Sequence, residues 1–437
     1  MDKPEFKEGP IKEKAKGKVR PEMNGQRLNA NLSALSQIGK NEAGGIDRAL
    51  GSQAEREARG WLKTYWEEKL SLNVRVDGGA NLWVRLEGSE DLLPIVTGSH
   101  HDTVPNGGKF DGALGVLAAT EVLETLIEKG IQTRHPIELV SFTGEEPNPY
   151  QVSTLGSKAV TGKMGRDKLL ALKNSLDGTG LQEELLVLGG DLSREDLVLN
   201  NNTLAAFVEL HIEQGRRLLD KNLSLAAVSQ ITGIYRESIR FKGEANHAGT
   251  TRMTDRHDAY LAACRFSLAF ESLLKEVSQG DGGNTAGTIG YVKVTPNSAN
   301  IIPGETELTL ELRSVAKESR ERVLEGLHLT HAEIERDRGV ALERKVILDQ
   351  PPVALDRGIL KTTREVLSEM GEGMPPLVSM AGHDAAHIQS IAPTGMLFVR
   401  SMDGKSHCPE EYTTEEDVKK AADALLQIIL KLDKELD

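Results

Sequence analysis

Five residues of metal-binding type lie at the ends of predicted strands or in the loops that follow them. They are three histidines and two carboxylates: His100, Asp111, Glu146, His211 and His407. Imidazole nitrogens and carboxylate oxygens are common ligands of zinc, manganese and cobalt in proteins. Two histidines and one carboxylate make an open catalytic site, and five ligands serve two ions if one carboxylate bridges them. Asp111 lies in a tight loop that opens a helix, so it is a candidate for that bridge.

Each of these residues also has an ordinary structural interpretation. His100 is followed by a second histidine and an aspartate, which is typical of a capped turn, and the Glu145–Glu146 pair is typical of solvated surface. A histidine after an apolar strand, such as His211, is often hydrogen-bonded inside a core. Spacing alone does not decide between the two interpretations. The joint placement of the five residues favours a metal site, because ligands of an open parallel sheet gather outside the carboxyl ends of its strands.

The segments that must position these residues alternate between strand and helix patterns. Three apolar runs that lead into candidate ligands are predicted strands: residues 93–97, 136–143 and 204–210. Between the first two runs, residues 112–129 carry a stripe of apolar side chains at helical spacing, and Gly130 ends it. A fourth strand is expected at 396–399, followed by a last helix with Thr413 as its cap and Glu416 three residues on. This order predicts an α/β fold with a parallel sheet and helices on its faces.

The middle of the chain has a different pattern. Alternating strands there surround two helical stretches, at 258–279 and 317–338, which predicts an α+β unit inserted into the α/β domain. A helical pattern also covers residues 27–69, and the polar residues before it lack an apolar core, so we expect a mobile tail. The predicted organisation is a tail, a catalytic domain in two segments and an insertion: residues 1–25, 26–225 with 347–437, and 226–346.

Composition argues against several classes of function. The 437 residues include 66 acidic and 53 basic side chains, a net charge of -13, whereas nucleic acids and anionic membranes select clustered basic charge. No apolar run approaches the roughly 20 residues needed to cross a bilayer, and the first residues do not form a secretory signal. The two cysteines, Cys264 and Cys408, argue for a reducing compartment. We therefore expect a cytoplasmic protein without nucleic-acid or membrane partners.

Seven motifs occur in an order that resembles a known family. They are GSHHDTVPNGGKFDGALGVLAA (98–119), FTGEE (142–146), ELHIEQG (209–215), NHAGTTRM (246–253), NIIPGE with LELRS (300–314), AGHDA (381–385) and SHCPEEYT (406–413). They resemble the amidase, hydantoinase and carbamoylase branch of the di-zinc aminoacylase and carboxypeptidase superfamily. The resemblance implies an α/β, di-metal aminopeptidase-like catalytic domain. It also implies an inserted ferredoxin-like α+β lid through which two copies form a homodimer.

The resemblance implies a cofactor of two divalent metal ions per subunit. One ion would be held by His100, Asp111 and His211. The second would share Asp111 as a bridge and add Glu146 and His407. The ions would be zinc, or manganese, cobalt or nickel.

The remaining implied roles concern catalysis and substrate binding. Glu145 would be the general base, which takes a proton from water and returns it to the leaving nitrogen. Asp102 would orient His100, and His247 would reach the active site of the partner subunit. Four further side chains would bind a small-molecule substrate, the middle two through its carboxylate: Gln214, Asn300, Arg313 and His383.

The leading activity implied by the resemblance is hydrolysis of an N-carbamoyl-L-amino acid to an amino acid, ammonia and carbon dioxide. The alternatives are an allantoate or ureidoglycolate amidohydrolase, an N-acyl amino acid deacylase or dipeptidase, and a non-catalytic binding or scaffold relative. The chain departs from the family pattern at three places: His101 stands for an apolar residue, Pro147–Tyr150 follows the two glutamates, and Arg252 stands for proline. These departures bear on the substrate rather than on the class of reaction.

Overall fold

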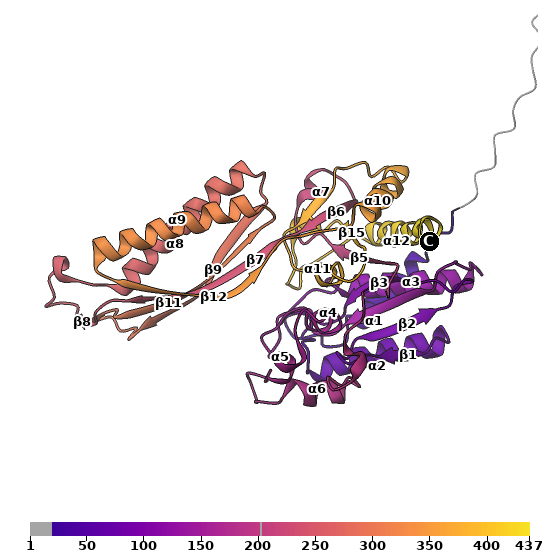
Figure 1. The fold of residues 1–437 in the computed structure, drawn as a ribbon, viewed down its shortest axis with the longest axis horizontal. Helices are drawn as coiled ribbons and strands as arrows, with labels where there is room; N and C mark the ends of the chain where they lie inside the picture. The colour runs from indigo at the N-terminus through magenta and orange to yellow at the C-terminus, as the bar shows by residue number, and fades with distance from the viewer. Residues whose placement is uncertain (1–19, 202) are drawn as a thin grey trace, which may run out of the picture.

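The computed structural model describes residues 20–201 and 203–437, and these form two units (Figure 1). One unit is built on a nine-stranded sheet, and the other on a four-stranded sheet that extends away from it. The chain enters the second unit after residue 231 and returns to the first after residue 350. We call residues 233–350 the insert and the rest the main domain.

The sheet of the main domain is mixed. Its strands are β1 (Val74–Val76), β2 (Leu82–Leu86), β3 (Ile95–His100), β4 (Ile137–Phe142), β5 (Ala206–Ile212), β6 (Leu225–Ile231), β13 (Val353–Ala354), β14 (Leu377–Ser379) and β15 (Thr394–Val399). They lie in the order β1-β2-β4-β3-β5-β15-β6-β13, with β14 beside β6. The central strands β4, β3, β5 and β15 are parallel to their neighbours within this group. Every residue of β3, β5 and β15 is buried, which explains why these strands are continuous apolar runs in the sequence.

Helices cover both faces of this sheet. They are α1 (Gly25–Leu35), α2 (Gln53–Thr64), α3 (Ala113–Glu128), α4 (Leu155–Val160), α5 (Arg166–Leu170), α6 (Leu181–Val187), α7 (Arg217–Asp220), α10 (Arg357–Glu369), α11 (Ala385–Ile388) and α12 (Glu415–Glu435). Ile95 of β3 packs in the core with α3 and α12, whereas its neighbour Val96 packs in the core on the other face with α11. Gly115 lets α3 approach the sheet closely, because a Cβ there would lie 2.4 Å from the carbonyl oxygen of Leu210. The start of α3 therefore lies close to the ends of β3 and β5.

The insert has ferredoxin-like topology. Its elements are β7 (Gly233–Lys242), α8 (Ala259–Gly280), β9 (Thr285–Thr295), β11 (Glu305–Ser314), α9 (Lys317–Arg338) and β12 (Ala341–Gln350). The four strands form an antiparallel sheet in the order β12-β7-β11-β9. Alternate residues of β7 and β11 are buried in a core with α8 and α9, which lie on one face. A short ladder of β8 (Asn246–His247) and β10 (Ile301–Ile302) forms the end of the insert farthest from the main domain (Figure 1).

Two predicted boundaries between the domains fall inside strands. Residue 226 belongs to β6 of the main sheet, and residue 346 belongs to β12 of the insert. The tail prediction is also too long at its C-terminal end, because Met23 is buried and its backbone nitrogen donates to Asp423 Oδ1 at 2.7 Å. Residues 1–19, the rest of that predicted tail, lie outside the described part of the chain.

Two helix predictions differ from the structure in detail. The helical pattern at 27–69 is divided into α1, α2 and a π-helical turn at Tyr65–Lys69, with a turn-rich segment after α1 that contains Gly39 and Gly44 at positive φ. The last helix is capped by Thr414 instead of Thr413, since the backbone nitrogen of Asp417 donates to Thr414 Oγ1 at 3.1 Å. Both differences shift element ends without changing the order of elements.

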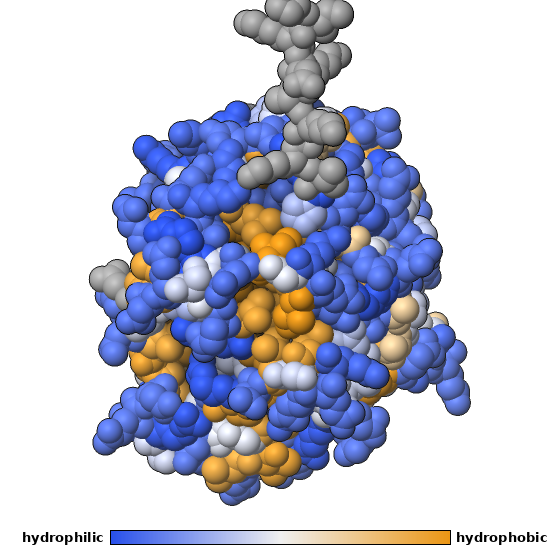
Figure 2. Space-filling model, turned by 90° about the vertical axis from the view of Figure 1, so that its right-hand side faces the viewer, coloured by the Kyte–Doolittle hydropathy of each residue, from blue (hydrophilic) through white to orange (hydrophobic). Residues whose placement is uncertain are grey.

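The outer end of the main domain has a mixed surface. Figure 2 shows this end with hydrophilic residues over most of its area and an apolar strip between them. The strip lies on the side away from the insert. None of the helices in the described residues is both long enough and apolar enough to cross a bilayer.

Candidate metal centre

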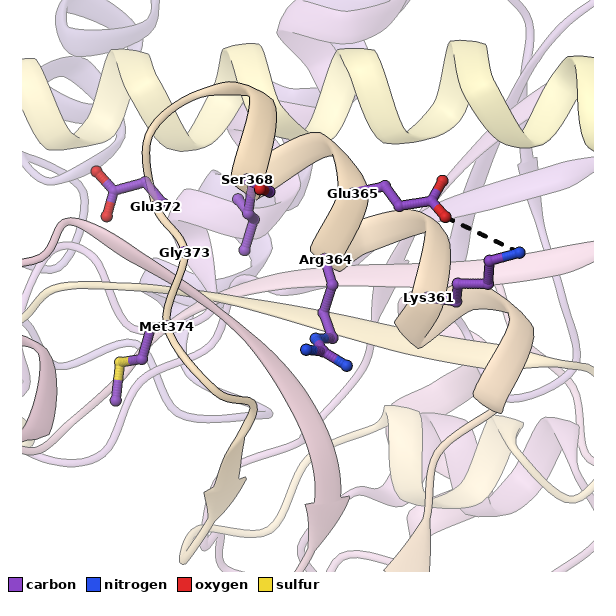
Figure 3. Close-up of a pocket in the computed structure, with 8 residues that line it drawn as sticks. Lys361, Arg364, Glu365, Ser368, Glu372, Gly373 and Met374 are labelled. Atoms are coloured by element: carbon purple, nitrogen blue, oxygen red, sulfur yellow. Dashed lines mark ion pairs between the residues drawn. The ribbon is translucent and has the colours of Figure 1, made fainter.

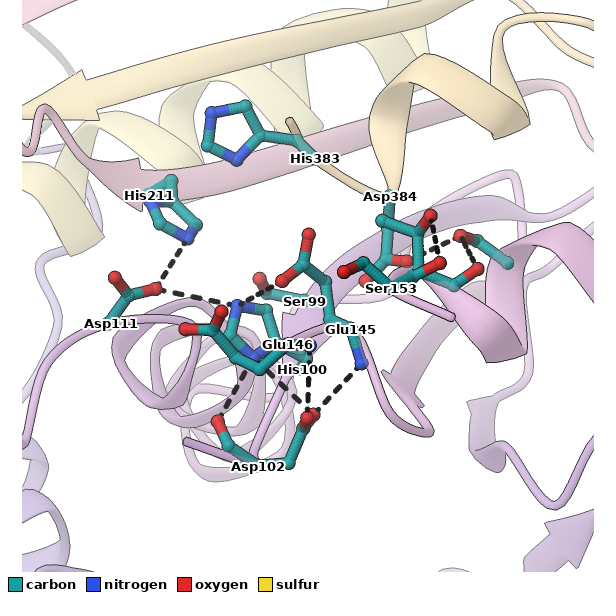
Figure 4. A network of polar contacts seen from close by, with 12 residues as sticks. Ser99, His100, Asp102, Asp111, Glu145, Glu146, Ser153, His211, His383 and Asp384 are labelled. Atoms are coloured by element: carbon teal, nitrogen blue, oxygen red, sulfur yellow. Dashed lines mark hydrogen bonds and ion pairs between the residues drawn. The ribbon is translucent and has the colours of Figure 1, made fainter. Parts of the chain in front are cut away.

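The five predicted ligands meet at one edge of the main sheet. Figure 4 shows four of them, His100, Asp111, Glu146 and His211. His100 ends β3 and His211 lies near the end of β5, with Asp111 between them. Oδ1 of Asp111 is 3.5 Å from Nε2 of His100 and 3.2 Å from Nε2 of His211. Oδ2 of Asp111 is 3.3 Å from Nε2 of His407, and that nitrogen is 3.4 Å from Oε1 of Glu146. Five separate segments of the chain thus deliver their side chains to one place.

This donor set fits two cations. One group consists of His100, Asp111 and His211, and another consists of Asp111, Glu146 and His407. Within each group the ligand atoms lie within 4.8 Å of one another, and Asp111 belongs to both groups. Atoms that bind a tetrahedral cation at about 2.0–2.2 Å are separated from each other by roughly 3.4 Å. The four distances around Asp111 and Glu146 run from 3.2 to 3.5 Å. The two oxygens of Asp111 face different histidines, as a bridging carboxylate requires.

The loop that carries Asp111 is held from two sides. Gly112 has φ 63°, and a Cβ there would lie 2.3 Å from the ring of His100, so a larger residue does not fit. Oε1 of Glu411 accepts hydrogen bonds from the backbone nitrogens of Phe110 at 2.8 Å and Asp111 at 3.0 Å. Glu411 lies in the SHCPEEYT motif but was not among the predicted site residues.

Asp102 connects the first histidine with the two glutamates. Its carboxylate accepts hydrogen bonds from the backbone nitrogens of Glu145 at 3.2 Å and Glu146 at 3.1 Å. Nδ1 of His100 is 3.6 Å from Oδ1 of Asp102 and 3.2 Å from its carbonyl oxygen. One buried residue therefore contacts both features. Its carbonyl oxygen faces the imidazole of His100, and its carboxylate holds the segment that carries the glutamates.

Burial and mutual charge shift the pKa values of these groups. Burial raises the pKa of Glu145 well above its usual value, against the opposing effect of His100. Burial, and then the charge of Asp111, raise the pKa of Glu146 to about 7. The hydrogen bond to Asp111 raises the pKa of His407 to about 8. Burial favours neutral Asp111, but the surrounding imidazoles outweigh it and hold its pKa well below the usual value. The raised pKa values mean that Glu146 and His407 hold protons near neutral pH, and bound cations would displace those protons.

The unusual segment after the glutamates forms a loop that supports their backbone. Nδ2 of Asn148 donates to the carbonyl oxygens of Glu146 at 3.0 Å and Val152 at 2.7 Å. The backbone nitrogen of Thr154 donates to the carbonyl oxygen of Glu145 at 2.7 Å. The departure at Pro147–Tyr150 therefore leaves both glutamates in the centre, and Oε2 of Glu145 lies 3.8 Å from Nε2 of His100.

His101, the other departure beside the ligands, is buried away from the centre. Its Nδ1 is 2.7 Å from Oγ of Ser141 on β4, and its Nε2 is 3.4 Å from Oε1 of Glu55 on α2. Nε of Arg48 donates to its carbonyl oxygen at 2.6 Å. His101 thus packs in a polar network behind the strand and does not join the candidate ligands.

Two of the predicted substrate-binding residues lie beside the ligands. Nε2 of Gln214 donates to Oδ2 of Asp111 at 2.7 Å, and its Oε1 is buried with no hydrogen-bond partner among the described residues. The ring of His383 packs 4.5 Å from that of His211, and its Nε2 is 2.7 Å from Oγ of Ser379. A buried acceptor without a donor, such as Oε1 of Gln214, suits a ligand that carries an N–H group.

Arg313 reaches the same region from the insert. Its Nη1 donates to the carbonyl oxygen of Met380 at 2.9 Å, three residues before His383. Its Nε donates to Oε1 of Glu311 at 2.8 Å. The guanidinium is 31% exposed, so it lies at the boundary between the insert and the main domain.

The structure does not bring His247 and Asn300 to this centre. Both are exposed, and they lie in or next to the β8–β10 ladder at the far end of the insert (Figure 1). Nδ1 of His247 accepts hydrogen bonds from the backbone nitrogens of Gly249 and Thr250, at 3.0 and 3.2 Å. Arg252, the third departure, lies nearby with an 81% exposed side chain. His247 and Asn300 thus lie away from the metal centre of their own chain in this structure.

One further hollow lies away from these residues. It has a volume of about 330 Å³ and is formed by α10 and the loop that follows (Figure 3). Lys361, Arg364, Glu372 and Met374 are among the residues that line it. None of the predicted site residues does, so this hollow is separate from the metal centre.

Comparison with known proteins agrees with this geometry. Residues 96–431 match peptidase family M20/M25/M40. The chain belongs to this family. All five candidate ligands and Glu145 lie inside the matched region of this M20 protein.

Several full-length relatives resemble this M20 protein. It is 35% identical to an N-carbamoyl-L-amino acid amidohydrolase of Geobacillus stearothermophilus, over 94% of this chain and 99% of that one. It is 32% identical to a ureidoglycolate hydrolase of Oryza sativa subsp. japonica, over 93% of this chain and 84% of that one. The crystal structure of an amidase of the hydantoinase/carbamoylase family from Burkholderia multivorans superposes with a TM-score of 0.84 at 32% identity, covering 94% of this chain and 98% of that one.

Proposed function

We propose that this protein hydrolyses the ureido group of an N-carbamoyl-L-amino acid with two divalent cations bound by its five ligands. The reaction consumes one water and yields the amino acid, ammonia and carbon dioxide. The chain is a metal-binding amidohydrolase that acts on C–N bonds other than peptide bonds. The observation that carries the two-cation proposal is Asp111, which is shared by two groups of three ligands beside Glu145.

The donor set suits zinc, or manganese, cobalt or nickel. His100, Asp111 and His211 would hold one ion, and Asp111, Glu146 and His407 the other. Such a pair of ions polarises a carbonyl group and lowers the pKa of water between them. Side chains of the protein would transfer the proton and bind the substrate.

Glu145 is the side chain placed to move the proton. It would accept a proton from the attacking water as a C–O bond forms at the ureido carbon, and pass it to the leaving nitrogen as the C–N bond breaks. A carboxyl group with a raised pKa is suited to both steps near neutral pH. The free Oε1 of Gln214 would accept a hydrogen bond from a ureido N–H and so orient the reacting carbon.

Arg313 would bind the carboxylate of the substrate. Its planar guanidinium matches the two oxygens of a carboxylate, and the side chain lies at the domain boundary next to the loop that leads to His383. This anchor supports a substrate that is an acid rather than a simple amide.

We also propose that the protein acts as a homodimer joined through the insert. His247 and Asn300 lie at the end of the insert farthest from the metal centre of their own chain, and in a dimer they would reach the centre of the partner. β9 is an outer strand of the insert's sheet, and exposed apolar side chains lie on it and on the neighbouring helix α8: Tyr260, Leu261, Leu268, Tyr291 and Val292. An open strand edge beside exposed apolar residues suits pairing with a second copy.

Ureidoglycolate or allantoate hydrolysis is the second candidate, and the likeness to a ureidoglycolate hydrolase favours it. Ammonia release from N-carbamoyl-L-amino acids, ureidoglycolate and allantoate, measured with metal-loaded enzyme, separates the two. The fastest turnover on an N-carbamoyl-L-amino acid supports the proposal, and turnover of ureidoglycolate alone contradicts it. Release of a carboxylic acid from N-acyl amino acids without ammonia release from any ureido acid would identify a deacylase. Absence of bound metal and of all turnover would identify a scaffold protein.

A further inference from the structure

A loop of the main domain carries His407, the most exposed of the five candidate ligands. Its side chain is 48% exposed, whereas those of the other four are 2–6% exposed. Its backbone has φ 59°, in the left-handed region that residues with a Cβ rarely adopt. The base of the loop is closed by a hydrogen bond of 2.8 Å from the backbone nitrogen of Met402 to the carbonyl oxygen of Tyr412, and the rings of Phe110 and Tyr412 pack there with centroids 6.1 Å apart. Burial holds His407 less firmly than the other ligands, so its position depends on contacts of the loop near His407 itself.

Ser406, the residue before His407, joins this loop to two carboxylates. Its Oγ lies 2.9 Å from Oδ2 of Asp111 and 2.8 Å from Oε2 of Glu411. Oδ2 of Asp111 is also the oxygen that lies 3.3 Å from Nε2 of His407. The hydroxyl of Ser406 therefore contacts the atom through which Asp111 would bind the second cation.

Glu411 completes the link between the two loops with its other oxygen. Its Oε1 accepts hydrogen bonds from the backbone nitrogens of Phe110 and Asp111, at 2.8 and 3.0 Å, while its Oε2 contacts Ser406. The side chain is buried, and Gly108 leaves room for it, because a Cβ at that position would lie 2.1 Å from Oε1 of Glu411. One carboxyl group thus holds the backbone of the Asp111 loop and the residue next to His407.

We propose that Ser406 and Glu411 are positioning residues that fasten these two loops together and thereby set the affinity for the second cation. The inference rests on the two-cation part of the proposed function. Groups that orient metal ligands through hydrogen bonds typically change metal affinity about 10- to 100-fold when they are replaced. The first cation would depend less on this link, because Ser406 contacts Oδ2 of Asp111, whereas Oδ1 faces the buried ligands His100 and His211.

The test measures the binding of cobalt(II) to the metal-stripped full chain, by titration calorimetry and by visible absorption. His407→Ala identifies the second binding step as the step that it abolishes. Ser406→Ala should weaken that step about 10- to 100-fold and leave the first step near its wild-type affinity. Ser406→Thr keeps a hydroxyl group and should keep most of the affinity. Lys405→Ala, which changes an exposed neighbour in the same loop, should leave both steps unchanged.

Glu411 is tested by a pair of variants of similar size. In Glu411→Gln, the amide oxygen can accept from the two backbone nitrogens and the amide N–H can donate to Ser406, whose hydroxyl can then donate to Asp111. The second step should therefore stay close to its wild-type affinity. Glu411→Leu offers neither contact and should weaken the second step at least as much as Ser406→Ala does. Should Glu411→Leu not fold, the loss of affinity in Ser406→Ala decides the question.

The outcomes separate this inference from the function on which it rests. A wild type that binds a single cobalt ion contradicts the two-cation proposal itself. If the wild type binds two ions and Ser406→Ala binds both with unchanged affinity, the two-cation proposal stands and the inference is overturned. Tighter binding of the second ion by Ser406→Ala would also overturn it, because the hydroxyl would then compete with the cation for Asp111. Equal weakening of both steps would overturn it as well, since the link would not be specific to the second cation.

Discussion

The metal centre and the far end of the insert differ in how completely one chain builds them. At the metal centre, neighbouring groups fix the ligands: Glu411 holds the Asp111 loop, and Asp102 holds both glutamates. At the far end, His247 is exposed, and among the described residues its Nδ1 accepts hydrogen bonds only from the backbone nitrogens of its own turn. One chain therefore brings the candidate cation ligands together by itself, whereas the proposed role of His247 depends on a second chain.

The largest expected effect is a loss of turnover when Glu145 at the metal centre is changed. Glu145→Gln keeps the shape of the side chain and removes the proton acceptor, so turnover should fall on the order of 10²–10⁴-fold. Cation content should remain at the wild-type level, because Glu145 is not among the five ligands. Rate and metal content are measured on the same preparation. Turnover close to wild type in the metal-loaded variant would show that another group moves the proton.

His247→Ala tests the proposed role of the far end of the insert in catalysis. An imidazole that donates to the developing oxyanion contributes on the order of 10²–10³-fold in kcat, so a loss of that size is expected with metal content unchanged. Co-expression of two tagged chains, one His247→Ala and the other Glu145→Gln, should restore activity. In the mixed dimer, one site then receives an intact Glu145 from its own chain and an intact His247 from the partner.

The mixed dimer also shows whether His247 acts within its own chain. In that case both sites of the mixed dimer carry one defect, and no activity returns.

A smaller effect is expected for the anchor at the boundary between the two regions. Arg313→Ala removes a charge-assisted contact worth about 1.5–3 kcal/mol, so KM for an N-carbamoyl acid should rise roughly 10- to 150-fold. Metal content should not change, because Arg313 touches none of the ligands through the contacts described here. Steady-state kinetics with an N-carbamoyl acid, and with the analogue in which its carboxylate is an amide, measure the change in KM. An unchanged KM for the acid would place the anchor elsewhere.

The smallest effect concerns pH. The pKa values of Glu146 and His407 are raised, to about 7 and about 8, so the metal-free protein holds protons there at neutral pH. A cation must displace these protons, and its apparent affinity should therefore fall as pH drops from 8 to 6, by up to about tenfold per pH unit for each proton displaced. Titration calorimetry at several pH values measures this dependence. An affinity that is flat across that range would contradict the proton linkage.

The meeting of the five candidate ligands could be predicted from the sequence because they lie at the ends of apolar strands or in the loops that follow them. A strand such as β3 appears as an apolar run, and its last residue, His100, marks the edge of the sheet. The order of strands and helices likewise predicted an α/β unit with an α+β insertion, and the family resemblance implied the ferredoxin-like topology of that insertion. Glu411 was not predicted, since it acts through two backbone nitrogens of a loop that is distant in sequence and leaves no periodic pattern.

Other details depend on tertiary packing that the sequence does not display. The boundary placed at 226 assigned most of β6 to the insert, although β6 pairs in the main sheet. The boundary placed at 346 assigned the last residues of β12 to the main domain, although β12 pairs in the insert's sheet. Met23 was assigned to the tail because one apolar residue in a polar segment gives no sign that it is buried. The burial of His101 follows from its contacts with Ser141 and Glu55, which come from two other elements.

Cation stoichiometry tests the central claim most directly. Metal analysis of the saturated and desalted protein should give two divalent ions per wild-type chain. His407→Ala should retain one, and Asp111→Ala should lose both, because both groups of ligands share Asp111. A wild type that binds a single ion at saturation, or an Asp111→Ala chain that still binds two, would contradict the account.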